Sequence, residues 1–227
     1  HASDIASVGV RRADGALIGL TYNRERGVVG WHRHPIGGTN AFVEAVQSIP
    51  APDSDADDLW LVVRRTISGE TKRYIEYLRA PLKETEAQED AFYVDSGLTY
   101  SGPPVETISG LGHLEGQTVQ TLADGAALPP KVVIGGGISH DREFTKAHVG
   151  LKYSARLQTM RIDAGAADGT AQGKLKNINK VAIRLLRSLG GHYGKSFSSL
   201  TEILFRSDSV PMDQAPPLFT GDKTDLQ

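Results

Sequence analysis

Residues 110–125 read GLGHLEGQTVQTLADG, and this stretch decides between a phosphate-binding loop and a β-hairpin. Its glycines stand at 110, 112 and 116, one residue too long for the dinucleotide-binding fingerprint, which also needs a helix after the last glycine. From Gln117 to Ala123, threonine and glutamine instead alternate with valine and leucine, and the alternation stops at Asp124 and Gly125. A period of two indicates a strand, and Asp-Gly suits the positive φ angles of a tight hairpin turn. The stretch therefore predicts a strand and a hairpin turn.

Similar turn signals occur along the whole chain, which has 25 glycines and many turn dipeptides between short β-rich segments. Near the N-terminus ASVGVRR and ALIGLTYN flank an Ala-Asp-Gly turn, and further on DLWLVVRRT and KRYIEYL flank Ser-Gly-Glu. Each pair predicts a hairpin, and single strands are expected over 28–34 and 41–50. The predicted fold class is mainly all-β.

Two segments, VGVRRADGALIGLTY and LVVRRTISGETKRYIEY, resemble each other weakly. Each is a strand ending in Arg-Arg, a glycine turn and a strand ending in tyrosine, and they lie about 54 residues apart, near the blade length of a β-propeller. Two copies cannot close a ring. Residues 1–82 are therefore interpreted as propeller-like blades of an incomplete propeller.

The best domain boundary is KETEAQEDA at 83–91, a polar segment expected to be a linker or a short exposed helix. Residues 92–163 predict a small β-barrel or sandwich domain, and AGAADGTAQG at 164–173 reads as a flexible connector. Residues 174–227 are expected to add C-terminal strands and a tail. Within them, KLKNINKVAIRLLRS favours a strand over a helix, LTEILFRSD is a strand or short helix, and APPLFTGDK is a terminal arm.

Composition excludes several classes of function. The 227 residues include no cysteine, which rules out disulfides, thiolate catalysis, zinc fingers and iron–sulfur clusters. A formal net charge of −2 gives no global attraction to nucleic acid or anionic lipid. No apolar run approaches the roughly 20 residues that span a bilayer, so no membrane insertion is predicted. Because the chain begins at His1, it is interpreted as a fragment or a trimmed form.

Two segments suggest metal binding. On a strand, His32 and His34 would share one face and could share a metal, but no third ligand can be named, and paired surface or interface histidines are favoured. Asp53, Asp55 and Asp57 open like a calcium loop, yet the loop's sixth residue, Asp58, is not the required glycine and its twelfth is an arginine. A solvated acidic loop over 53–58 is favoured over loose calcium binding.

The sequence contains neither the G-x-S-x-G nor the S-x-x-K element of nucleophilic catalysis. The Asp95–Gly97 turn, DSG, has no histidine nearby in sequence, although His113 or His140 could approach it in space, and turn chemistry is favoured. A carboxylate pair of a glycosidase cannot be recognised by spacing, so three glutamates stay open as candidates: Glu76, Glu106 and Glu115. We predict no catalytic, cofactor-binding or metal residue, no cofactor and no enzymatic activity.

A basic stretch runs from Lys174 to Lys195 with no acidic residue among its members. It could bind phosphates, but only Tyr193 lies beside it, so a stacking platform for single strands is not supported. A solvated or subunit-facing strand is favoured. The basic residues are Lys174, Lys176, Lys180, Arg184, Arg187 and Lys195.

The order of several motifs carries a resemblance. WHRH, LWLVVRR, KRYIEYL, FYVDSGLTY, GLGHLEGQTVQTLADG, HVGLKY and GKLKNINKVAIRLLRS follow one another, and the run after DSGLTY is the most specific. Over most of residues 8–195 the chain resembles the C-terminal part of the tail tubular, nozzle-type or "stabilization" virion proteins of short-tailed bacteriophages and related prophages. A complete subunit of that kind is much longer, so the resemblance implies a fragment or a short form, whose own ring assembly is in doubt.

The resemblance implies a structural protein of the virion, made in the bacterial cytoplasm, with no active site. Copies of it, typically six, would form a ring below the portal and adaptor, and double-stranded DNA would pass through the ring transiently. Two alternatives stay open. A glycosidase of propeller type would need its acids to face one cavity, whereas a glycan- or receptor-binding module would use exposed aromatics such as Trp31, Trp60, Tyr93, Tyr100 and Tyr153.

Overall fold

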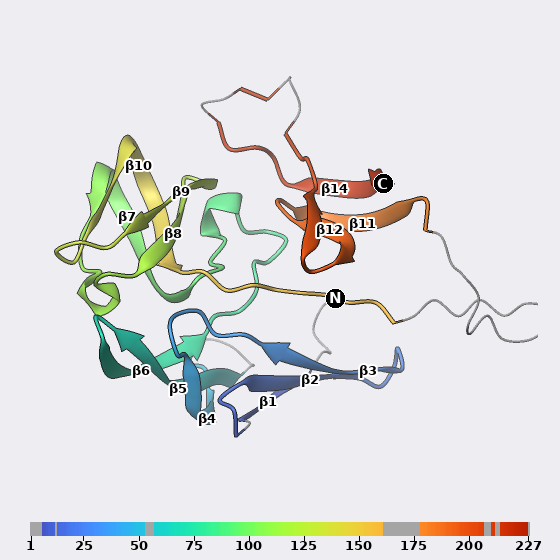
Figure 1. Cartoon of the computed structure of the whole chain (residues 1–227), viewed down its shortest axis with the longest axis horizontal. Helices are drawn as coiled ribbons and strands as arrows, with labels where there is room; N and C mark the ends of the chain where they lie inside the picture. Colours follow the sequence, from blue (N-terminus) through green and yellow to red (C-terminus); the bar gives the residue numbers. More distant parts are fainter. Residues whose placement is uncertain are drawn as a thin grey trace, which may run out of the picture. The chain divides into compact units, whose positions relative to one another are not determined.

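The computed structural model describes residues 6–11, 13–52, 57–160, 178–206, 210–211 and 214–226. These residues form strands and loops and contain no α-helix; helical turns are limited to two three-residue 3-10 turns, Gln88–Asp90 and Gly112–Leu114. The predicted all-β class is therefore confirmed (Figure 1). The chain divides into two compact units, residues 1–155 and 156–227. No helix in the described part of the chain is long and apolar enough to cross a membrane.

The first unit begins with two three-stranded antiparallel sheets. One contains β1 (Ala6–Arg11), β2 (Leu17–Asn23) and β3 (Val28–His34), and the other contains β4 (Phe42–Pro50), β5 (Asp57–Ile67) and β6 (Glu70–Leu78). Both predicted hairpins are present, as β1–β2 and β5–β6. Whether these sheets correspond to propeller blades stays a prediction.

A shared apolar core connects the two sheets. Leu17 on β2, Val43 on β4, and Leu61 and Val63 on β5 are buried together. Burying each such side chain contributes roughly 1.5–3 kcal/mol. The amide of Val43 also donates to the carbonyl of Gly15 at 2.9 Å, which fixes the β1–β2 turn against β4.

A third sheet follows in the same unit. Its strands β7 (Asp95–Ile108), β8 (Thr118–Ala123), β9 (Ala126–Val132) and β10 (Ile138–Leu151) lie in the order β7-β10-β8-β9. The predicted Asp124–Gly125 turn joins β8 to β9, with φ angles of 46° and 78°. The Asp124 carboxylate accepts hydrogen bonds from the amides of Thr145 and Lys146. The hairpin turn is therefore fastened to β10.

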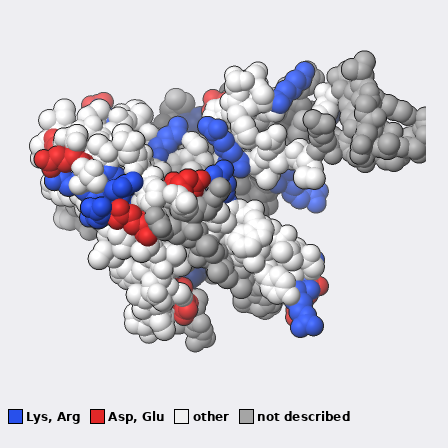
Figure 2. Space-filling view, turned by 60° about the horizontal axis from the view of Figure 1, so that its bottom comes forward, with Lys and Arg blue, Asp and Glu red and all other residues white. Residues whose placement is uncertain are grey.

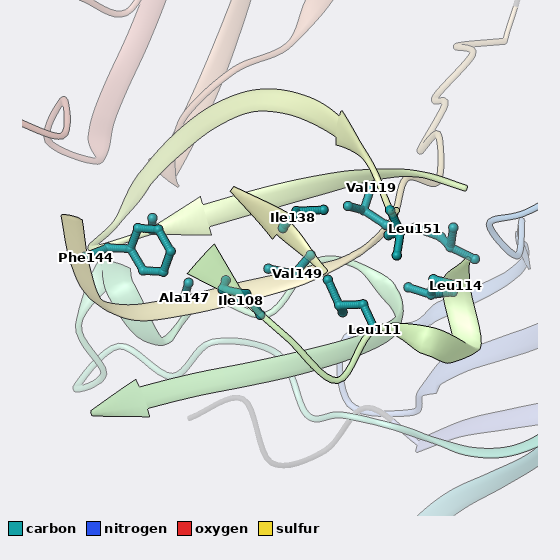
Figure 3. Packing of buried hydrophobic residues seen from close by; sticks show 11 residues of the cluster. Ile108, Leu111, Leu114, Val119, Ile138, Phe144, Ala147, Val149 and Leu151 are labelled. Carbon is teal, nitrogen blue, oxygen red and sulfur yellow. The ribbon is translucent and has the colours of Figure 1, made fainter. Parts of the chain in front are cut away.

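The core of this sheet is the largest in the described residues (Figure 3). Phe144 and Val149 on β10 and Val119 on β8 meet Leu111 and Leu114, which come from the loop between β7 and β8. Of the two forms expected for this region, a small barrel or a sandwich, the closed barrel is not formed, because β7 and β9 are the two edges of an open sheet. The loop that carries Leu111 and Leu114 covers the core. The core is therefore buried without a pairing between β9 and β7.

The segment 83–91 contains only the 3-10 turn Gln88–Asp90 and lies inside the first unit. Gln88 donates to the carbonyl of Gly125 at 2.7 Å, and Asp90 pairs with Lys146. The segment thus packs on the β8–β9 hairpin and on β10. A domain boundary at 83–91 stays a prediction.

The second unit contains two small sheets. β11 (Val181–Ser188) pairs with β14 (Phe219–Leu226), and β12 (His192–Ser196) pairs with β13 (Ser199–Glu202). The strand favoured for this region is present as β11. The expected terminal arm is instead strand β14 from Phe219 onward, and Lys223 on it lies 4.5 Å from the ring centre of Phe219. The connector expected at 164–173 lies outside the described residues.

Candidate functional site

The glycine-rich stretch around 110–117 contains Glu115, whose carboxylate binds a second glycine turn at 135–136. Glu115 accepts hydrogen bonds from the amides of Gly135 and Gly136, at 2.9 and 2.7 Å. Both glycines have positive φ, 61° and 73°, which turns their consecutive N–H groups toward one acceptor. Such a pair of amides could bind an anion, but here it binds Glu115. This candidate glutamate therefore closes a loop.

The Asp95–Gly97 segment does meet a histidine in space. His113 Nε2 donates to the carbonyl oxygen of Ser96 at 2.9 Å, and Ser96 has a φ of 50°. A Cβ on Gly97 would lie 2.6 Å from the Phe92 ring, so this position requires glycine. The turn expected at Asp95–Gly97 is not present: these residues begin strand β7, at a register shift against β10, and the imidazole bonds a backbone carbonyl there. His140, the other candidate, bonds the hydroxyl of Thr121 instead.

A buried ion pair connects β5 and β6 in the first unit. The Arg65 side chain is 0% exposed and pairs through both terminal nitrogens with Glu76, while its Nε donates to the Gly37 carbonyl at 2.7 Å. The Gly37 amide donates to Asp95 at 2.6 Å. Burial raises the pKa of Asp95, and the Gly37 hydrogen bond and Arg65 partly oppose that rise. The cluster joins β5, β6, the loop before β4 and the start of β7.

The His32–His34 pair has the predicted common side of β3. The two rings meet edge to face with centroids 4.7 Å apart, and His32 Nε2 lies 3.0 Å from the Thr21 hydroxyl. Burial, and then the neighbouring His32, lower the pKa of His34. The described residues contain no group of three or more metal-ligating side chains, and we assign no metal to this pair.

His148 is buried and acts as a structural link. Its Nε2 donates to the Glu89 carbonyl and its Nδ1 accepts from the Thr99 hydroxyl, both at 2.9 Å. Burial lowers its pKa, which favours the neutral ring, and the proton lies on Nε2 because a carbonyl can only accept. The histidine therefore ties β10 to β7 and to the 3-10 turn.

The remaining polar candidates are not gathered into one cavity. Glu76 and Glu115 are held by different partners, and Glu106 is exposed on β7. Residues 53–56 lie outside the described part, while Asp57 begins β5 and accepts from the Ser48 hydroxyl at 2.6 Å. The glycosidase alternative therefore has no assembled carboxylate pair among these residues.

The basic stretch is described only from residue 178 onward. Arg184 on β11 makes two hydrogen bonds to Asp222 on β14, at 2.7 and 2.8 Å. Its charge is therefore balanced across the strand pair. Lys174 and Lys176 lie outside the described residues, and the only aromatic beside the stretch, Tyr193, is half-buried on β12.

The surface of the first unit carries two apolar areas on its sheets. We name the first the β2–β3 face; Tyr22 pairs with Val29, and Leu20 pairs with Trp31. Tyr22, Val29 and Trp31 are 47%, 65% and 67% exposed.

Figure 2 shows one side of the molecule, where basic and acidic side chains form small mixed groups with broad uncharged areas between them.

The second area is the outer side of β5–β6, which we name the β5–β6 face. It consists of two cross-strand pairs, Trp60 with Tyr77 and Val62 with Ile75. Sequence reasoning singled out Trp60 but missed Ile75 and Tyr77, which are 75% and 55% exposed. The alternation in KRYIEYL already places both on one side of the strand.

The other aromatic candidates differ in their surroundings. Tyr100 donates to the Pro103 carbonyl and packs against Phe144 of the core, and Tyr153 is half-buried, with a pKa raised by burial and then by Asp95. Tyr93 is exposed.

No protein-family model matches this chain, and no curated protein has a significantly similar sequence. The two sheet faces therefore carry the functional argument.

Proposed function

We propose that this chain is a structural subunit of a bacteriophage tail, which assembles with copies of itself into a ring of the nozzle type. The observation that supports the proposal is the exposed β2–β3 face. The order of motifs along the chain resembles that of tail proteins, and Glu76, Glu115 and His113 all bind partners within the chain. In this proposal the chain has no enzymatic activity, resides in the virion and contacts double-stranded DNA only while DNA passes through the ring.

The β2–β3 face has the character of a subunit contact. Trp31 and Val29 lie on β3, an edge strand, and Tyr22 and Leu20 lie beside them on β2. Fully burying an aliphatic side chain of this size contributes roughly 1.5–3 kcal/mol, and aromatic residues are enriched at interfaces. The exposed Arg33–Asp14 ion pair, at 3.4 Å, provides a polar rim next to this area. A second copy of the chain is the partner that we assign to it.

Light scattering across a concentration series tests this assignment. We expect the wild-type chain to form a closed oligomer, and Trp31→Glu to shift it strongly toward monomer because a charge would be buried in the contact. Ile75→Glu is the matched control, since it places the same charge on an exposed apolar position of the other sheet. A chain that stays monomeric, or a Trp31→Glu variant that assembles like wild type, overturns the proposal.

Two further readouts distinguish a ring from any other oligomer. Electron microscopy of the assembled fraction should show rings with a central opening. Added double-stranded DNA should bind weakly and dissociate as salt is raised, because the chain has a net charge of −2 and offers few phosphate contacts. Filaments without closure, or salt-resistant DNA binding, would contradict a passive channel.

A further inference from the structure

The β5–β6 face combines an aromatic platform with an apolar extension. Trp60 and Tyr77 are directly paired across the strands, with ring centroids 5.4 Å apart and planes at 37°. The next pair along the same side is Val62 with Ile75. The platform is therefore several side chains wide.

Fixed charges lie at the other end of the same side. The pair after Val62–Ile75 is Arg64 with Arg73, and a bulge in β4 brings Glu44 to both of them. Arg73 makes two hydrogen bonds to Glu44, at 2.8 and 3.2 Å, and Arg64 lies 3.9 Å from the same carboxylate. Two guanidinium groups thus share one carboxylate. This end of the face carries an excess positive charge.

Arg64 is also positioned by the ring of Phe42. Its guanidinium carbon lies 4.7 Å from the centre of the Phe42 ring, a cation–π distance. A positioned guanidinium is pre-organised to bind a planar carboxylate through two parallel hydrogen bonds. The geometry of the charged end therefore suits a planar carboxylate.

From these features we propose that the β5–β6 face binds an acidic oligosaccharide, one whose sugars carry carboxylates. The C–H side of a sugar ring packs on Trp60 and Tyr77, and a carboxylate further along the chain binds the Arg64 and Arg73 end. The two ends are four residues apart along the strand, about 13 Å at the usual rise, so the ligand is an oligosaccharide and not a single sugar.

Single-stranded nucleic acid is the competing ligand for aromatic and basic side chains. Nucleic-acid grooves track many phosphates and intersperse aromatics with cations along the path. Here the excess positive charge lies at the Arg64–Arg73 end of the face, whereas the residue that alternation places beside Trp60 on the same side of β5 is the acidic Asp58. The arrangement fits a ligand with one apolar end and one anionic group, which favours the acidic glycan.

Calorimetric titration of the full chain tests the proposal. The probes are an oligogalacturonate, an oligomer of sialic acid, a neutral galactose oligomer and a single-stranded oligothymidylate. We expect at least one acidic oligosaccharide to bind more tightly than the neutral one, and the affinity to fall as salt is raised. Equal binding of neutral and acidic probes, preference for the oligothymidylate, or no binding to either acidic probe overturns it.

Variants assign the binding to this face. Tyr77→Ala should weaken acidic-glycan binding about tenfold because it removes half of the platform. Arg64→Gln with Arg73→Gln should abolish the preference for acidic over neutral probes. Trp31→Ala is the matched control on the β2–β3 face and should leave the glycan affinity unchanged. An equal loss with Trp31→Ala would refute the assignment.

This inference does not depend on the proposed assembly, because it uses a different sheet. Tyr77→Ala should change glycan affinity without changing the mass of the particle in solution, whereas Trp31→Glu should change the mass without changing glycan affinity per chain. The two proposals can therefore fail separately.

Discussion

Glu76→Gln removes the charge that balances Arg65 while keeping the side-chain size and one hydrogen-bond acceptor. Removing one partner of a buried ion pair costs about 3–5 kcal/mol, because the remaining charge stays buried without compensation. Two features reduce that cost. Glu76 keeps 18% of its side chain exposed, and Asp95 lies close enough for its charge to interact with both members of the pair. We therefore expect a loss of about 2–3 kcal/mol in the free energy of unfolding.

Urea denaturation followed by tryptophan fluorescence measures this loss. Both tryptophans, Trp31 and Trp60, belong to the first unit, so the signal follows the unit that contains the ion pair. The denaturation midpoint should fall while the m-value stays constant. Glu70→Gln is the matched control, because its Lys72 partner and Glu70 itself are exposed, and no measurable change is expected.

A double variant separates charge burial from packing. Arg65→Met with Glu76→Leu replaces the pair by apolar side chains and should recover most of the stability lost in Glu76→Gln. A loss below about 1 kcal/mol in Glu76→Gln, as for an exposed pair, would show that water reaches Arg65 and would refute the reasoning.

Three other substitutions have definite expected results. Burial raises the pKa of Asp95 above the ordinary 3.8. The contribution of the protonated Asp95 to the free energy of unfolding is therefore fully present below pH 3.8 and is lost as the pH rises through the folded-state pKa. Asp95→Asn, which can still accept from Gly37, should therefore raise the free energy of unfolding more at pH 7 than at pH 3, in urea titrations at both values. Burial lowers the pKa of His148 below 6.5. The contribution of the neutral His148 to the free energy of unfolding is therefore fully present above pH 6.5 and is lost as the pH falls from 6.5 toward the folded-state pKa. His148→Gln should make that acid-side slope shallower in thermal melts between pH 5 and pH 8, and an unchanged slope would exclude His148 as a contributor. Gly125→Ala forces a side chain onto a φ of 78° and should cost about 1–2 kcal/mol, against little change for Gly112→Ala, whose added Cβ meets open space.

The local turns of this fold could be predicted from the sequence because their chemistry lies in two adjacent residues. Asp124 and Gly125 form the β8–β9 turn, and Ser68 and Gly69 form the β5–β6 turn, with positive φ at all four positions. Each dipeptide tolerates the required backbone and stands between alternating strands. Hairpins built on these signals were found where they were expected.

Contacts between distant segments could not be predicted in the same way. β14 pairs with β11, and β10 lies between β7 and β8, because of pairings that local alternation does not encode. The same limit explains the barrel that did not form. A strand pattern states which side of each strand is apolar, but not whether the first and last strands meet.

The sequence carries a signal for the buried arginine. Leu61, Val63 and Ile67 are buried on one side of β5, and alternation places Arg65 on that side too. An arginine inside an apolar row requires a carboxylate partner. Its identity depends on the register of β6 against β5, which the turn sets and the sequence pattern alone does not reveal.

The pairing of Asp95 with Leu151 means that the chain enters and leaves the β7–β10 sheet at one point. Neighbouring ends are the geometry that lets a segment be inserted into a loop of a host protein, and the two ends of residues 95–151 meet in this way. The same geometry sets its response to tension. Force applied to the two ends of this segment would break the hydrogen bonds between β7 and β10 one after another, beginning at the Asp95–Leu151 pair.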